Sequence, residues 1–96
     1  MVMIVKDYTK LKEKADLLKA LGHPVRLCIT RNLLGGECNV SYMQECLGLP
    51  QPTISQHLAI LRRAGIIAPQ RKGTEINYTV VNEDIRPVIL ALFKER

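Results

Sequence analysis

Apolar and polar positions follow a helical rhythm in the first third of the chain. Between Asp7 and Leu21, apolar residues recur at three- and four-residue steps and charged residues occupy the other faces, which predicts an amphipathic helix. Gly22 ends it, and Pro24 opens a second helix to about Leu34, because proline is tolerated in a first helical turn. The chain therefore starts with two helices joined by a short turn.

A helix-turn-helix is predicted next. Gly35 and Gly36 interrupt the pattern, and a short segment leads into a helix over about 41–47, with Gly48 as its C-terminal cap. A tight turn precedes a fourth helix, over about 51–64. The apolar positions of this fourth helix are Ile54, Leu58, Leu61 and Ile60. Two helices joined by a short glycine-containing turn form the helix-turn-helix arrangement.

The last third of the chain predicts a hairpin followed by a helix. Segments 66–71 and 75–81 flank Lys72-Gly73-Thr74, and Pro69 places its strand at an edge because proline cannot donate to a ladder. In the second strand, Ile76, Tyr78 and Val80 alternate with polar residues. Asn82 is expected to cap a final helix that starts with acidic residues. The predicted fold is mainly α with a β-hairpin wing (α+β), in the order α-α-α-α-β-β-α: one winged helix-turn-helix domain spanning 1–96.

The first and last helices each carry an apolar stripe without an obvious partner in a chain of 96 residues. We expect these stripes to form the interface of a homodimer, since a small domain gains from association. The expected interface residues are Leu11, Ala15, Leu18, Val88, Ile89, Leu92 and Phe93. The alternative is that the two helices pack on each other within one chain.

Charge points to an anionic partner. Lys and Arg outnumber Asp and Glu by 14 to 9, which suits nucleic acid or an anionic membrane surface. No acidic residue occurs between Glu45 and Glu75, so the positive charge is local. The chain has no long apolar run or strongly amphipathic basic helix for a membrane, and its start is too short and too soon charged for a secretory signal. With three cysteines and no CxxC spacing, a reducing cytoplasm is the expected compartment.

The start of the fourth helix and the hairpin tip are the predicted DNA contacts. Glutamine can pair bidentately with adenine, hydroxyls reach bases or phosphates, and a helix N-terminus attracts phosphate. The expected contact residues are Gln51, Thr53, Ser55, Gln56 and His57 on the helix, with Arg71, Lys72 and Thr74 at the basic tip. Alternatively, the hydroxyls are caps and the other side chains are merely solvated. Arg62 and Arg63 lie late in the helix, where one of them can serve an internal salt bridge.

In these segments the chain resembles the arsenical-resistance repressor family, also called ArsR/SmtB. The residues that carry the resemblance are Leu18–Leu27, Leu47–Leu58, Leu61–Ile67 and, in the wing, Arg71, Gly73 and Tyr78. The resemblance implies a homodimeric repressor whose recognition helices enter successive major grooves of an inverted-repeat operator until an effector releases it. It also implies that the first and last helices form the dimer and that the fourth helix faces DNA through Gln51, Thr53, Ser55, Gln56 and His57.

The metal sites of the family are not matched here. Metal-responsive members carry a Glu-Leu-Cys-Val-Cys type motif, in which two thiolates one residue apart grip a soft ion. The matching stretch is Glu37–Ser41, where Cys38 is out of register by one. The other family site falls on Asn82, Asp84 and Glu95, without a histidine. We therefore expect no metal and no cofactor. A hard-ion site formed by Asp84 and Glu95 is the alternative, but acids at helix ends more often interact with the helix dipole or with solvent.

The chain has three cysteines, Cys28, Cys38 and Cys46. Cys28 and Cys46 are expected to be small buried hydrophobes, and Cys38 is the thiol expected at the surface, so a redox switch involving Cys38 is a hypothesis. His23, before Pro24, is assigned a turn role.

Sequence-specific repression is the leading function, and a winged-helix module that binds protein is the alternative. An enzyme is not expected, because no nucleophile, base and orienting acid show recognisable spacing.

Overall fold

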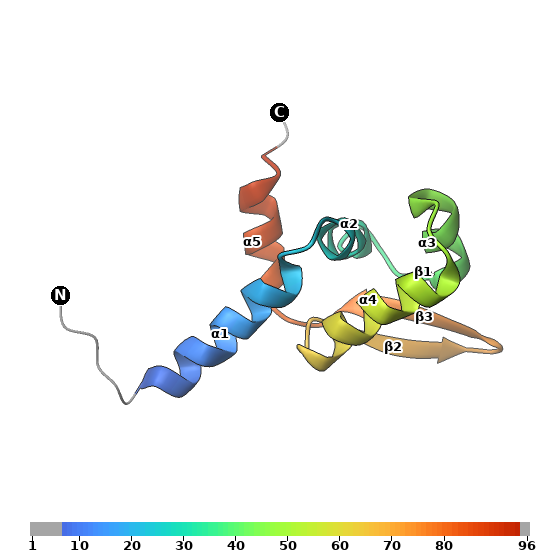
Figure 1. The fold of residues 1–96 in the computed structure, drawn as a ribbon. Coiled ribbons are helices and arrows are strands. Elements are labelled where there is room, and N and C mark those ends of the chain that lie inside the picture. Colours follow the sequence, from blue (N-terminus) through green and yellow to red (C-terminus); the bar gives the residue numbers. More distant parts are fainter. Residues whose placement is uncertain (1–6, 95–96) are drawn as a thin grey trace.

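The computed structural model describes residues 7–94, which form five helices and three strands (Figure 1). Residues 1–6, where the sequence argues against a secretory signal, lie outside the described residues. Glu95, one of the two acids weighed for a hard-ion site, lies outside them too. In chain order the elements are α1 (Tyr8–Leu21), α2 (Pro24–Leu33), β1 (Cys38–Asn39), α3 (Val40–Leu47), α4 (Gln51–Arg63), β2 (Ile67–Lys72), β3 (Glu75–Val80) and α5 (Ile85–Leu92). The predicted order is confirmed, with β1 as an addition.

Local side-chain chemistry sets where the helices begin and end. The Nδ1 atom of His23 accepts a hydrogen bond from the Val25 N–H at 3.1 Å, which caps the start of α2. Asn39 caps α3 in the same way, accepting from the Tyr42 N–H at 2.9 Å. Gly48 ends α3 in the left-handed conformation, with φ at 66°. The turn role predicted for His23 is thus a helix cap.

The core lies where α2, α4, β2 and α5 meet. Its fully buried side chains are Ile29, Ile54, Leu61, Ile66, Ile67, Ile85 and Ile89. Leu58 is also buried and Ile60 is half-buried, as the periodicity of α4 predicts. One predicted interface residue is wrong: Ile89 is 2% exposed and packs inside its own chain, so it is not available to a partner.

The sheet is antiparallel, with strand order β1-β3-β2. Pro69 lies on the edge strand β2, opposite Tyr78, as predicted from its missing N–H. The alternation predicted for β3 holds only in part. Tyr78 and Val80 pack against the core, but Ile76 is 38% exposed because it lies beside the hairpin turn and beyond the core, while Asn77 is buried.

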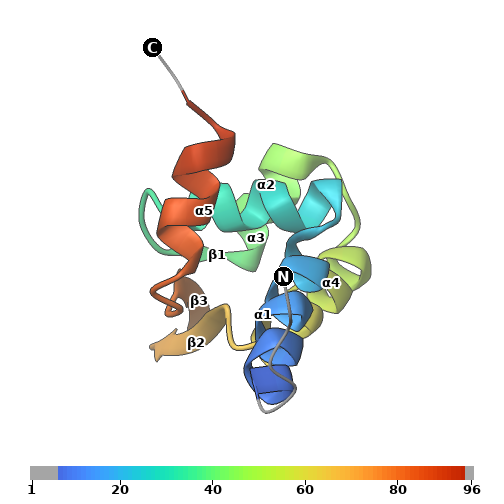
Figure 2. The same cartoon turned by 90° about the vertical axis from the view of Figure 1, so that its left-hand side faces the viewer.

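The outer helices α1 and α5 extend from the body and converge near the end of α1 (Figures 1 and 2). Near the middle of α1, Lys14 Nζ forms an ion pair at 2.5 Å with Oδ2 of Asp84, which directly precedes α5. Asn82 is not the cap of α5; its side chain accepts from the Asp84 N–H at 2.9 Å, and the helix begins at Ile85. The second half of α1 and the start of α5 therefore lie against each other within one chain.

Candidate nucleic-acid interface

Helix α4 presents a polar face to solvent because its opposite face is anchored in the core. Ile54 and Leu61 are fully buried, so the helix has one rotational setting. In that setting Gln51, Ser55 and Gln56 are exposed, and Thr53 is half-buried. The exposed residues belong to the first two turns, which is the part of a recognition helix that meets base edges in the major groove.

The start of α4 is also suited to phosphate. Pro50 precedes the helix without a side-chain cap, and its carbonyl accepts from the Thr53 and Ile54 N–H groups at 3.1 and 3.2 Å. The helix has 13 residues, enough for a full terminal dipole with its positive end here. Arg62 and Arg63 are exposed at the far end of the helix, and neither forms an ion pair with another described residue.

His57 differs from the other predicted contact residues because its side chain turns inward. Its ring lies 4.5 Å from the His23 ring, centroid to centroid, and its Nδ1 atom is 3.2 Å from Arg26 Nη1. Burial lowers the pKa of the His57 imidazole from its ordinary value, and His23 and Arg26 lower it further. The structure thus groups His57 with the α1–α2 turn rather than with the exposed side chains of α4.

The wing carries its exposed charge at the tip, which projects from the same end of the molecule at which α4 begins (Figure 1). Arg71 and Thr74 are exposed there. Lys72 instead forms an ion pair with Glu37, whose Oε1 also accepts from Asn77 Nδ2 at 3.4 Å. Of the two basic residues at the tip, Lys72 is therefore ion-paired within the chain. Arg71 forms no ion pair with another described residue.

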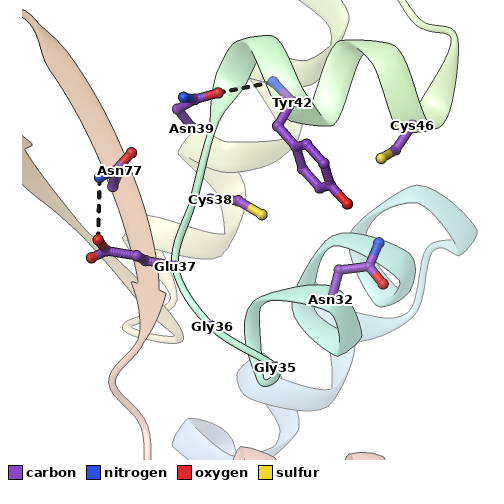
Figure 3. Close-up of a pocket in the computed structure, with 9 residues that line it drawn as sticks. All are labelled: Asn32, Gly35, Gly36, Glu37, Cys38, Asn39, Tyr42, Cys46 and Asn77. Atoms are coloured by element: carbon purple, nitrogen blue, oxygen red, sulfur yellow. Dashed lines mark hydrogen bonds between the residues drawn. The ribbon is translucent and has the colours of Figure 1, made fainter.

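A second feature is an open cavity of about 610 Å³ between the end of α2, β1 and α3. The thiols of Cys38 and Cys46 and the ring of Tyr42 point into it (Figure 3). The prediction that Cys46 is buried and Cys38 is at the surface is wrong: Cys46 is exposed and Cys38 is half-buried. Helix α3 is short and turns Met43 and Leu47 inward, which leaves Cys46 on its outer side.

In this cavity, which we call the thiol cavity, the pKa values of Cys38 and Tyr42 are raised. Burial raises the pKa of the Cys38 thiol, and the nearby Cys46 raises it further. The pKa of Tyr42 is also raised, first through its side-chain hydrogen bond with Cys46. Cys28 is half-buried elsewhere on α2, where its Sγ accepts from Asn32 Nδ2 at 3.7 Å.

Metal-ligand side chains do not converge in residues 7–94: no group of three or more His, Cys, Asp or Glu there can hold an ion. Asp84, one of the two acids weighed for a hard-ion site, is ion-paired with Lys14.

No helix in the described part of the chain is long and apolar enough to cross a membrane.

A helix-turn-helix followed by a β-hairpin, with a polar recognition helix and a basic wing tip, defines a winged helix-turn-helix protein. The model of the bacterial regulatory protein, arsR family, matches residues 23–68. The chain is also 37% identical over 84 residues to the biofilm growth-associated repressor of Xylella fastidiosa, covering 88% of this chain and 74% of that protein. The chain belongs to the arsR family of bacterial regulatory proteins.

Solved structures agree with this assignment. Reduced HlyU from Vibrio cholerae superposes with a TM-score of 0.88 at 30% identity, covering 95% of this chain and 96% of that one. The homodimeric winged helix-turn-helix domain of Mb0332 from Mycobacterium bovis has a TM-score of 0.83 at 27% identity, covering 94% and 83%. The predicted family and fold class are confirmed, and the protein is a transcriptional regulator rather than an enzyme.

Proposed function

We propose that this protein is a dimeric transcriptional repressor that binds an inverted-repeat DNA operator in the cytoplasm. The observation that carries the proposal is the exposed polar face of α4, formed by Gln51, Ser55 and Gln56 and held outward by buried Ile54 and Leu61. Thr53 adds a hydroxyl donor for phosphate, and the positive end of the helix dipole lies beside it. Arg71 and Thr74 at the wing tip supply backbone contacts beside the groove.

The dimer rests on apolar surface that one chain leaves uncovered. Leu11 and Leu18 on α1 are 44% and 58% exposed, and Leu92 on α5 is 62% exposed. A cavity of about 320 Å³ between α1 and α5, lined by Leu18 and Val88 among others, provides a recess for a second copy. The proposed interface also includes Ala15, which is exposed on α1, and Phe93, which is half-buried at the end of α5. A two-fold dimer would place its recognition helices about 34 Å apart, which calls for a two-fold operator.

Selection of bound sequences from random duplex DNA tests this function. We expect an enriched inverted repeat with half-sites one helical turn apart, bound by two chains. The selected duplex, with one half-site scrambled, is the control and should bind far more weakly than the intact repeat. Failure to enrich any sequence would favour the alternative, a winged-helix module that binds protein.

We also propose that the thiol cavity is the site of effector control. Cys46 is the exposed thiol, so it meets a peroxide first: its sulfur takes one oxygen to become a sulfenic acid, and one water is released. The Cys38 sulfur then attacks the Cys46 sulfur, which forms a disulfide and releases a second water. The disulfide would tie the first helix of the helix-turn-helix to β1 and shift it relative to α4.

Peroxide treatment of the reduced protein is expected to weaken operator binding about tenfold, within the usual range of coupling between sites. The weakening should reverse with a dithiol reductant and vanish in Cys38→Ser and in Cys46→Ser, with mass spectrometry reporting the disulfide. Cys28→Ser is the matched control and should respond as the unaltered chain does. Unchanged operator affinity in the oxidised protein would rule out this control mechanism.

A further inference from the structure

Three elements converge on the buried side of the recognition helix. Arg26 of α2 donates through Nε to the carbonyl of Ala20, the end of α1, at 2.5 Å. Its Nη1 atom reaches His57 Nδ1 on α4 at 3.2 Å. The His57 ring in turn contacts the ring of His23, which caps α2. Arg26 therefore connects both helices of the first pair to the helix that carries the predicted DNA contacts.

The hydrogen bonds of this cluster define the protonation state of both rings. A guanidinium has only donors, so the contact between Arg26 and His57 requires an unprotonated Nδ1 on His57. The Val25 N–H is likewise a donor, so Nδ1 of His23 must be an acceptor too. Both imidazoles are therefore neutral, with their proton on Nε2. A second proton on His57 would place an N–H against the Arg26 N–H groups and two positive charges side by side.

We infer that His57 is a positioning residue: its neutral imidazole, held by Arg26 and His23, latches the recognition helix onto the α1–α2 turn, and protonation of His57 opens the latch and weakens DNA binding. This inference rests on the proposed DNA-binding function. It removes His57 from the set of base-contacting residues and gives it an indirect role, through the position of α4.

The surroundings of His57 set the direction of the pH effect. The titratable and charged groups that act on its ring are His23 from the turn and Arg26 from α2, and no carboxylate of the described residues is among the causes of its pKa shift. Burial, His23 and Arg26 all lower the pKa of His57 below its ordinary value of 6.5. The latch is therefore complete above pH 6.5 and is lost as the pH falls through the lowered pKa of the folded chain.

Operator affinity as a function of pH distinguishes the latch from a direct contact. A histidine that faced phosphate would gain a charge in acid and tighten binding, as would the overall rise in positive charge. The latch predicts the opposite: affinity of the full chain for the selected operator should fall about tenfold between pH 7.5 and the acid side of the His57 titration, the effect expected for losing one hydrogen bond to a charged group. Affinity that rises in acid would overturn the inference.

Variants separate the two histidines, which are the only ones in the chain. In His57→Asn the amide oxygen can accept from Arg26 but cannot titrate, so binding at pH 7.5 should stay within about threefold and the loss in acid should disappear. His57→Phe keeps a ring without an acceptor and should bind weakly at every pH. His23→Asn retains a helix cap and should keep the acid response. Loss of the response in His23→Asn, rather than in His57→Asn, would overturn the assignment.

Nuclear magnetic resonance of the imidazole nitrogens in the free chain provides a readout that needs no DNA. We expect His57 Nδ1 to be unprotonated at pH 7.5 and His57 to titrate below pH 6.5. A proton on Nδ1 would contradict the latch. If selection yields no operator, the proposed function fails, and this measurement still decides whether the latch exists.

Discussion

Replacing Leu18 with aspartate is expected to separate the proposed dimer and weaken operator binding at least a hundredfold. Leu18 is 58% exposed in one chain, so the change should leave the fold intact. A two-fold interface contains the residue twice, and each lost leucine removes about 1.5–3 kcal/mol of burial. Each new carboxylate must also be desolvated without a partner, which adds a further cost. A monomer then binds one half-site and loses the benefit of two linked contacts.

Sedimentation equilibrium and operator titration measure the two effects of this change. Thr9→Asp is the matched control, because it places the same charge on an exposed position of α1 on the side away from Leu18. It should leave both the dimer and the affinity unaltered. A Leu18→Asp chain that still sediments as a dimer would show that the interface lies elsewhere.

Replacing Gln56 with alanine is expected to weaken binding to the selected operator by about 5- to 150-fold, while binding to random duplex DNA changes little. The side chain is exposed on the first two turns of α4, and a bidentate base contact contributes about 1–3 kcal/mol of discrimination. Titration of both duplexes at one salt concentration measures the effect. Equal losses on the two duplexes would show that Gln56 does not read sequence.

Arg71→Ala is the matched comparison, because Arg71 is expected to contact phosphate rather than bases. It should weaken operator and random duplex alike and reduce the slope of log affinity against log salt by about one. Lys72→Ala should have a smaller effect, since Lys72 is ion-paired with Glu37 within the chain. A selective loss on the operator in Arg71→Ala would instead indicate readout by the wing.

The order of helices and the hairpin were predictable because each follows from local rules. Helical periodicity placed α1 and α4 to within a residue, and the missing N–H of Pro69 placed β2 at an edge. Predictions failed where a residue's surroundings come from distant segments. Ile89 and Leu92 belong to one apolar stripe of α5, yet the stripe is divided between the chain's own core and solvent. A periodicity of 3.6 residues reports that a face is apolar, not what covers it.

For the candidate site, the sequence by itself determined which chemistry is present: an amide- and hydroxyl-rich start of α4, a basic wing tip and a thiol in each of β1 and α3. Only the tertiary structure decided how these groups are used. It turned His57 toward Arg26 and His23, paired Lys72 with Glu37, and brought Cys38 and Cys46 to one cavity. The physical reason is that side-chain types and local backbone preferences are encoded residue by residue, whereas hydrogen-bond partners and burial depend on packing between segments far apart in the chain.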